Sequence, residues 1–366
     1  MKLLSFEAIN FRNIAHCTFT PHEVFSFIHG NNGQGKTNLM EALHLLFTLR
    51  PIRTGNDIRP LLMQGAEYFS LRAQVDDLEG SHELFFSFSR SGAKKLILDG
   101  VEATPREFLT FGPVMFFSPD QAALIVESPE VRRRAIDRSV FHVEPSFYEL
   151  LAQFKGTLKR RNSILKMDND PRLLASIDRS FAPLAFEVSR RRRQFIEALA
   201  PYFSAVWAVL KPSIFPMSIS FFENLGNAQG EEELYTLLRN ASNADFQRKT
   251  SLLGPQREDL HFLVEEKSSK FFVSHGERKI AALAFIIACI QLIREKSGRV
   301  PLFLLDDLAA ELDTKTRELV LSYLDHINLQ IVMTGIFFPW ETNKEGRFLT
   351  INEGVLSLNE SGTRQK

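Results

Sequence analysis

The feature that most constrains the fold is a glycine-rich segment at residues 30–37. It reads Gly-Asn-Asn-Gly-Gln-Gly-Lys-Thr and fits the pattern GxxxxGK[ST]. A β-prone run at 24–28 precedes it, and apolar residues recur at helical spacing over 36–49, which predicts an amphipathic helix. A glycine-rich turn between a strand and a helix is typical of phosphate-binding loops. The chain is therefore predicted to contain an α/β nucleotide-binding unit.

The residue types in this loop match the chemistry of phosphate binding. Gly30, Gly33 and Gly35 are predicted to let the backbone aim its N–H groups at phosphate oxygens. Lys36 is predicted to reach the β- and γ-phosphates of ATP and to be catalytic, and the Thr37 hydroxyl to bind Mg²⁺. The remaining loop residues expected to contact ATP are Asn31, Asn32 and Gln34.

A second motif follows an apolar run at 300–305, which fits a central strand buried on both faces. Asp306 and Asp307 end this run, and buried carboxylates are costly unless a cation or a polarised water needs them. Asp306 is predicted to bind Mg²⁺, and Asp307 to orient or deprotonate the attacking water. An ordinary strand ending in a solvated loop is the alternative for this run taken alone.

A third motif is Ser274-His275-Gly276-Glu277, at the start of another predicted helix. A serine hydroxyl and free N–H groups at a helix start offer an anion site. A simple helix N-cap is the alternative.

Together the three motifs resemble those of the ATP-binding-cassette (ABC) superfamily. The resemblance implies a Walker A loop at Gly30–Thr37, a signature motif at Ser274–Glu277, a Walker B strand at Leu302–Asp306 and a D-loop at Ala310–Asp313, with Asp313 as a site residue. In that superfamily two subunits sandwich two ATP molecules, and the signature motif of one subunit binds the γ-phosphate held by the other. An ATP-dependent homodimer is the expected assembly.

Within the superfamily, the chain resembles the RecF family of bacterial recombination and gap-repair proteins. Transport ATPases have a shorter gap between loop and signature, and Rad50-like proteins fill that gap with a long coiled coil. The segments that support the resemblance are Asn10–Asn13, the loop extension to Asn38 and Glu41, Leu49–Thr54, Phe117–Asp120, Ser128–Arg138 and Leu253–Leu260. It implies that Arg12 and Asn38 join the ATP site and that Asp120 joins the Mg²⁺ ligands.

Some positions depart from these patterns. Gln256 and Glu258 replace a histidine and an aspartate of the family, and His275 stands where arginine is common. The stretch at 334–336 lacks the switch histidine of transport ATPases, and Asp307 replaces their glutamate. A weak ATPase that works as a slow switch is therefore expected.

The fold class predicted from these motifs is α/β, an ABC-type P-loop ATPase head with a largely helical second lobe and no long coiled coil. Residues 1–122 and 298–366 are expected to form the first lobe, and 123–297 the second.

Charge points to a local nucleic-acid surface. The chain has 44 Lys and Arg against 44 Asp and Glu, so any affinity for DNA must come from a patch. Basic residues cluster within 131–211, and such a stripe suits phosphate binding. The expected DNA contacts are Arg132, Arg133, Arg134, Lys159, Arg160, Arg161, Arg190, Arg191, Arg192 and Arg193. Solvated helix faces or salt bridges between the lobes are the alternatives.

The expected function is an ATP-induced dimer that clamps duplex or gapped DNA without sequence specificity and helps load a recombinase after DNA damage. Partners similar to RecR and RecO, and the recombinase RecA, are implied by the resemblance alone. The alternatives are an ABC-type ATPase of transport or translation that ignores DNA, and a scaffold that binds ATP without hydrolysing it. Two cysteines and a charged N-terminus favour a cytoplasmic protein without a membrane partner.

Overall fold

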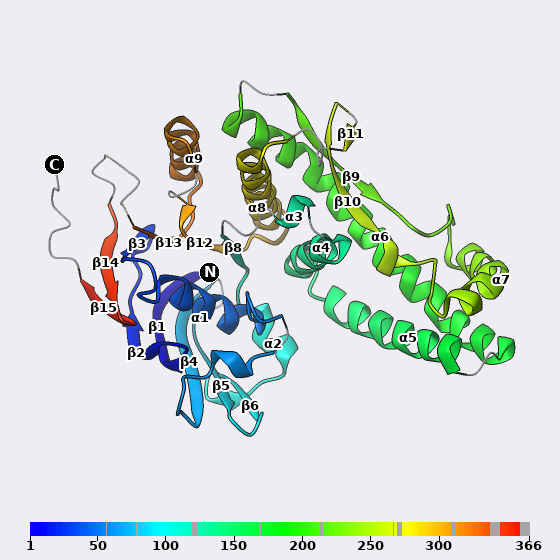
Figure 1. Ribbon diagram of the computed structural model, residues 1–366, viewed down its shortest axis with the longest axis horizontal. Coiled ribbons are helices and arrows are strands. Elements are labelled where there is room, and N and C mark those ends of the chain that lie inside the picture. Colours follow the sequence, from blue (N-terminus) through cyan, green and yellow to red (C-terminus); the bar gives the residue numbers. More distant parts are fainter. Residues whose placement is uncertain are drawn as a thin grey trace. The chain divides into compact units, whose positions relative to one another are not determined.

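The chain divides into two compact units (Figure 1). The first comprises Met1–Gln121, Val209–Lys211 and Ile293–Lys366, and the second Ala122–Ala208 and Pro212–Leu292. The structure, a computed structural model, describes residues 1–55, 57–77, 80–118, 123–126, 128–167, 170–212, 215–265, 267–268, 273–308, 312–336 and 345–358. Segments from both ends of the chain therefore fold together as one unit.

A six-stranded sheet of the first unit has the order β15-β14-β3-β13-β12-β8. Its strands are β3 (Phe25–His29), β8 (Val114–Phe117), β12 (Leu302–Leu305), β13 (Ile331–Gly335), β14 (Arg347–Asn352) and β15 (Val355–Leu358). All neighbouring strands are parallel except the β14–β15 pair. Every residue of β8, β12 and β13 is buried, which confirms the central strand predicted before Asp306.

A second, antiparallel sheet of the same unit has the order β2-β1-β4-β5-β6-β7. Its strands are β1 (Lys2–Phe11), β2 (Ile14–Phe19), β4 (Tyr68–Asp76), β5 (Ser81–Ser89), β6 (Lys94–Leu98) and β7 (Val101–Glu102). The turn between β6 and β7 places Asp99 and Gly100 at φ 50° and 81°, the positive values that a two-residue hairpin of this type requires.

Helix α1 (Lys36–Thr48) packs against strands of both sheets, in one hydrophobic core that they share. The predicted apolar positions are buried, but so are the polar residues Glu41, His44 and Thr48. The helix predicted over 36–49 is confirmed, but its polar positions are mostly buried as well, because both sheets cover it. The shorter elements of this unit are η1 (Arg59–Leu61), α2 (Pro105–Thr110) and α9 (Thr314–His326).

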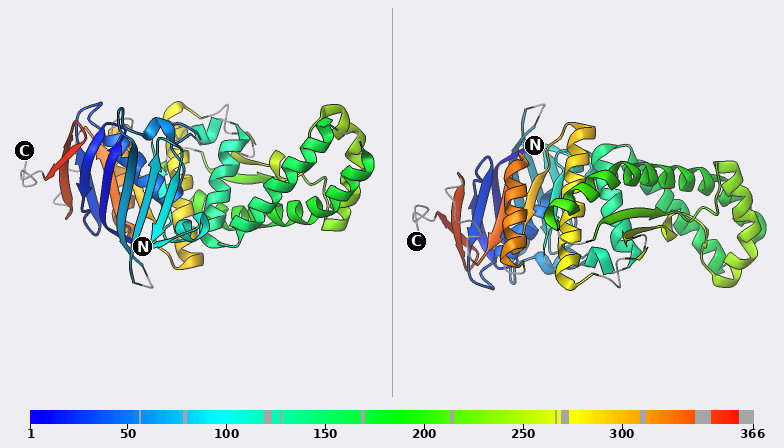
Figure 2. Two further views of the ribbon diagram at one scale, coloured as in Figure 1. Left: turned by 90° about the horizontal axis from the view of Figure 1, so that it is seen from below. Right: turned by 90° about the horizontal axis from the view of Figure 1, so that it is seen from above.

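The second unit is mostly helical. Its helices are α3 (Ala123–Val126), α4 (Pro129–Val143), α5 (Phe147–Met167), α6 (Pro171–Leu210), α7 (Glu231–Arg248) and α8 (His275–Ser297), with η3 (Pro255–Arg257); the last residues of α6 and α8 belong to the first unit. Helices α5 and α6 run side by side in both views of Figure 2. Helix α6 spans 40 residues, continues through Pro183 and Pro201, and ends at Leu210, two residues before Pro212.

This unit also contains a small antiparallel sheet that the sequence did not predict. Its order is β11-β10-β9, formed by β9 (Met217–Phe222), β10 (Asp259–Val264) and β11 (Lys267–Ser268). Among the described residues of both units, the helices are too short or too polar to cross a membrane.

Candidate nucleotide-binding site

The order of the parallel strands brings the predicted motifs to one edge of a sheet. Strand β13 lies between β3 and β12, and carboxyl ends of parallel strands meet at the same edge. The loop from Gly30 follows β3, Asp306 and Asp307 follow β12, and Thr334 lies near the end of β13. Residues from both ends of the chain therefore lie together at the carboxyl edge of this sheet.

The glycines of the loop are required for two different reasons. Gly33 and Gly35 have φ values of 83° and 110°, which agrees with their predicted role in the turn. Gly30 has no positive φ; a Cβ atom there would lie 2.7 Å from the carbonyl oxygen of Ile351 in β14. Glycine is thus required at position 30 because β14 leaves no room for a side chain. Nothing in the sequence indicated that β14 contacts the loop.

The turn between β14 and β15 also holds the loop from outside. The Gly354 N–H donates to the Gln34 carbonyl at 2.9 Å, and the Glu353 N–H donates to the Gln34 side-chain oxygen at 2.7 Å. Gln34, predicted to contact ATP, therefore uses its amide oxygen to fix the loop.

A cavity of about 270 Å³ opens beside the loop. The residues that line it are Asn32, Gly33, Gly35, Lys36, Thr37, Asn38, Arg53 and Asp307. The Lys36 ammonium is buried and donates to the carbonyls of Gly30 at 2.6 Å and Asn31 at 3.1 Å. Because α1 begins at Lys36, its first N–H groups lack partners within the helix, which favours an anion here.

Asp306 is buried beside the hydroxyls of two threonines. Its carboxylate accepts a hydrogen bond from Thr334 at 2.5 Å and another from Thr37. Burial raises the pKa of Asp306, the negative charge of Asp307 adds to this, and the two hydrogen bonds oppose it. A divalent cation would relieve that cost. One carboxylate and one hydroxyl suit Mg²⁺, which takes few protein ligands and completes its shell with phosphates and waters.

Asp307 lines the cavity in an uncommon conformation. Its φ is 45°, and its N–H donates to the Thr334 hydroxyl at 3.2 Å. Its buried Oδ1 has no hydrogen-bond partner among the described residues, so its capacity to accept a hydrogen bond is unused. Thr334 thus contacts both acids, a role that sequence reasoning missed. The available signal was a hydroxyl residue at the end of an otherwise apolar strand.

The Glu41 cluster, formed by Arg12, Glu41 and Arg53, lies beside this cavity. The Glu41 side chain is fully buried and accepts from Arg12 Nε at 2.6 Å and Arg53 Nη2 at 2.8 Å. Arg53 also donates to Asn38 at 2.6 Å. Burial raises the pKa of Glu41, but the hydrogen bonds and charges of Arg12 and Arg53 outweigh burial and lower it.

Two predicted ATP ligands are therefore held by protein groups in this cluster. The Nη2 atom of Arg12 is buried and has no hydrogen-bond partner among the described residues. The Asn38 side chain forms hydrogen bonds with Arg53 and with Asn13. Arg53, which the sequence assigned no role, lines the cavity. It lies in the stretch that supported the family resemblance, so a signal for it existed.

The predicted signature and D-loop residues cap helices. Ser274 and Glu277 form a reciprocal pair at the start of α8: the Ser274 N–H donates to the Glu277 carboxylate at 2.6 Å, and the Glu277 N–H to the Ser274 hydroxyl at 3.3 Å. His275 and Gly276 are exposed. Asp313 accepts from the Thr316 N–H at 2.9 Å and caps α9. The predicted Mg²⁺ ligand Asp120, like residues 310 and 311 of the D-loop, lies outside the described residues.

Three of the predicted DNA contacts are wrong because their side chains are buried in ion pairs. Arg132 pairs with Asp259 at 2.6 Å, and Arg192 with Asp137 at 2.8 Å. Arg161 is 0% exposed and pairs with two aspartates. A guanidinium enclosed in this way cannot reach a phosphate.

The other predicted DNA contacts are more accessible. Arg133 is half-buried and donates to the Glu258 carbonyl. Arg134, Arg190, Arg191 and Arg193 form ion pairs with nearby glutamates: Glu130, Glu187, Glu144 and Glu223. Lys159 and Arg160 are exposed, and neither forms an ion pair with any residue that the structure describes.

Comparisons with known proteins show the family and the fold of the chain. The sequence profile of the family described as RecF/RecN/SMC N terminal domain matches residues 2–337. The DNA replication and repair protein RecF of Lactobacillus gasseri is 30% identical over 380 residues, which cover 99% of this chain and 100% of the relative. A solved structure of the recombination mediator protein RecF with ATP, in the RecFOR pathway, has a TM-score of 0.88 and 26% identity, covering 98% of this chain and 97% of that one.

A more distant structure shares the fold alone. The Smc head bound to the C-winged helix domain of ScpA has a TM-score of 0.58 and 17% identity, over 98% of this chain and 97% of that one. The predicted fold class is confirmed: an ABC-type head with a largely helical second unit, and no long coiled coil in the described ranges.

Proposed function

The chain belongs to the RecF family, within the RecF/RecN/SMC N-terminal domain group, and from this premise we propose that it is an ATP-dependent DNA-binding protein of recombinational gap repair and replication restart. ATP joins two copies into a clamp on DNA, and slow hydrolysis releases them. The observation that supports this most is the meeting of Lys36, Thr37, Asp306 and Asp307 around one cavity and its edge.

Each residue at the cavity has a proposed part in ATP chemistry. Lys36 exchanges its two loop carbonyls for the β- and γ-phosphates. Thr37 and Asp306 would hold Mg²⁺, which would neutralise charge that develops on the phosphates. Asp307 orients the attacking water with its unpaired Oδ1. An aspartate reaches water less well than a glutamate, so turnover is slow.

The proposed dimer uses the exposed start of α8 in trans. Ser274, His275 and Gly276 are open to a second molecule, and the N–H groups at a helix start attract phosphate. In the dimer, the Ser274 hydroxyl exchanges its contact with Glu277 for the γ-phosphate held by the partner. Replacing Ser274 by arginine is expected to leave ATP binding intact and to prevent dimer formation.

DNA binding is proposed to depend on the dimer, because the chain has no net charge. Accessible ion pairs such as Arg134–Glu130 and Arg193–Glu223 are weak, so their arginines can exchange carboxylates for DNA phosphates. Two copies double this surface, so ATP gates the affinity. By analogy with the relative of the RecFOR pathway, the proposed partners are RecR and RecO, together with the recombinase RecA.

The test measures binding to a gapped duplex with ATP, with ADP or without nucleotide, while light scattering follows dimer formation. ATP alone should give dimers and tight binding that weakens with salt. Lys36→Ala should abolish ATP binding, and the exposed Lys95→Ala serves as its control. Asp307→Asn should retain ATP, lower turnover about 100-fold and prolong the dimer.

Other results would contradict parts of this proposal. ATP dimers that ignore DNA would favour the alternative of a transport or translation ATPase. If ATP turnover and the lifetime of the complex both stay unchanged in Asp307→Asn, a scaffold that hydrolyses nothing would be favoured. A dimer that survives Ser274→Arg would exclude the proposed sandwich.

A further inference from the structure

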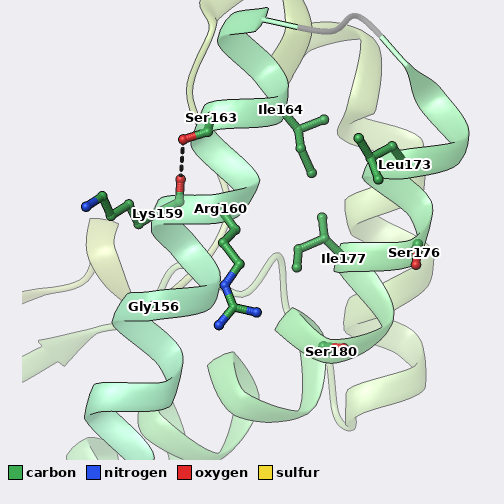
Figure 3. A pocket seen from close by; sticks show the side chains of 9 residues that line it. All are labelled: Gly156, Lys159, Arg160, Ser163, Ile164, Leu173, Ser176, Ile177 and Ser180. Atoms are coloured by element: carbon green, nitrogen blue, oxygen red, sulfur yellow. Dashed lines mark hydrogen bonds between the residues drawn. The ribbon is translucent and has the colours of Figure 1, made fainter.

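A groove of about 690 Å³ runs between α5 and α6 in the second unit (Figure 3). One wall consists of Gly156, Lys159, Arg160 and Ser163 of α5, and the other of Leu173, Ser176 and Ile177 of α6. On each helix these positions are three or four residues apart, so they form one continuous face. The groove is therefore a regular trough between two neighbouring helices.

The cations of this groove differ from the buried arginines of the unit. Arg132, Arg161 and Arg192 are buried in ion pairs. Lys159 and Arg160 are exposed and have no acidic partner in the described part of the chain. In Figure 3, Arg160 points into the space between the helices, whereas Lys159 leaves α5 on the side away from α6. Arg160 inside the groove and Lys159 on its outer flank therefore favour a ligand with negative charge that reaches past the edge of α5.

The floor of the groove is aliphatic. Ile164 and Ile177 belong to a small core, and Leu173 on the rim is 44% exposed. All three point into the groove in Figure 3. A DNA backbone offers nothing for such side chains to bury, and the lining contains no aromatic ring on which a base could stack. The ligand that fits must combine aliphatic and acidic groups.

Gly156 leaves room for close approach. It lies inside α5, where glycine is a poor helix former, and a Cβ atom added to it would meet no heavy atom within 4 Å. No packing within the described chain therefore requires glycine here. Together with Ser163 and Ser176, it gives the groove low walls that admit another backbone.

We propose that the groove between α5 and α6 binds an acidic amphipathic helix of a partner protein. The apolar face of that helix, with residues spaced three and four apart, covers Ile164, Leu173 and Ile177, as in other helix-in-groove complexes. Its flanking carboxylates pair with Lys159 and Arg160. This surface goes beyond the proposed ATP and DNA function and shares no residue with the nucleotide cavity.

The test uses the full chain and a fluorescent peptide of about four helical turns, with leucines on one face and glutamates on the other. Fluorescence anisotropy should give a Kd of about 10–100 µM, which is normal for a short single-helix contact. Lys159→Glu with Arg160→Glu should weaken binding about tenfold or more, since each pair becomes a repulsion. The same double variant should gain affinity for a peptide with lysines in place of the glutamates.

Two further variants separate the groove from general charge. Gly156→Leu should fold normally and block the peptide, because its side chain enters open space. Lys166→Glu, at an exposed position of α5 outside the groove lining, should leave binding unchanged.

Three outcomes would overturn the proposal. One is no binding of the acidic peptide, and another is equal loss in Lys166→Glu. The third is a double variant that loses only gapped-duplex binding, which would make the groove a DNA surface. ATP-induced dimer formation, measured in the same variants, should stay unchanged and so tests the proposed function separately.

Discussion

Each unit contains a cluster of arginine and carboxylate side chains. The two clusters are built from similar residue types but differ in net charge. In the Glu41 cluster, Arg12 and Arg53 share one buried carboxylate, so the formal charge is +1. In the second unit, Arg161 forms ion pairs with both Asp178 and Asp245, at 2.6 and 2.7 Å, so the formal charge of that cluster is −1. Ser251 accepts a further bond from Arg161.

The arginines of the Glu41 cluster are also more exposed than the side chains of the Arg161 cluster. The arginine side chains of the Glu41 cluster are 20% and 40% exposed, and Arg53 lines the nucleotide cavity. All three side chains of the Arg161 cluster are 0% exposed. An excess of positive charge with an open side can bind an anion. A closed cluster with an excess of carboxylate can only join the elements that supply it, here α5, α6 and α7.

The largest expected effect comes from breaking the closed cluster. Arg161→Met leaves two buried aspartates without a cation and should lower the free energy of unfolding by about 3–5 kcal/mol. Its neighbour offers a matched control: Arg160→Met, at an exposed position, should change it by less than about 0.5 kcal/mol. Urea denaturation followed by circular dichroism measures both. Equal effects would show that Arg161 does not hold the unit together.

Opening the other cluster should affect binding and leave folding nearly intact. Arg53→Ala removes a cavity cation while Arg12 still neutralises Glu41, so ATP affinity should fall about tenfold. Arg90→Ala, at an exposed surface pair of the same unit, should have no effect. Titration calorimetry with ATP measures both variants. A large loss of stability with unchanged affinity would place Arg53 with the structural arginines.

The Thr334 hydroxyl contacts both acidic residues that follow β12, Asp306 and Asp307. Thr334→Val removes the hydroxyl that joins Asp306 and Asp307, and ATP turnover should fall about three- to tenfold. ATP affinity should stay within about twofold, because the hydroxyl is not in the cavity lining. Thr334→Ser should restore turnover. If serine fails while valine keeps the fold, the methyl group, and not the hydroxyl, is what matters.

The smallest expected effect is a difference in pH dependence. The pKa of Glu41 is lowered by its arginines against the effect of burial, so its contribution to stability is present above the ordinary value of 4.5 and lost as the pH falls below it. Burial raises the pKa of Asp178, with Asp245 adding to this against the opposing bond from Arg161, so its contribution is fully present below 3.8 and lost as the pH rises.

The two variants Glu41→Gln and Asp178→Asn should therefore show opposite trends. Destabilisation by Glu41→Gln should shrink on acidification below pH 4.5, and destabilisation by Asp178→Asn should grow. Urea midpoints across this range measure the trends. Parallel curves would mean that the two carboxylates have similar surroundings in the folded state.

The sequence alone located the candidate nucleotide site because its motifs are local. The loop at Gly30–Thr37 depends on backbone turns within one short segment, and the pair Asp306–Asp307 depends on an apolar run that must be a buried strand. Such constraints restrict the residue types at neighbouring positions in the sequence. They were sufficient to predict the fold class, the strands and helices around the site, and the residues that line the cavity from the loop.

Tertiary structure decided which charges are available. A row of arginines looks the same in sequence whether it faces solvent or is buried, and only the fold brought Asp178 and Asp245 to Arg161. The same holds for Thr334, which contacts two acids because β13 lies beside β12. The cost of a buried charge depends on the groups that surround it, and those groups come from distant parts of the chain.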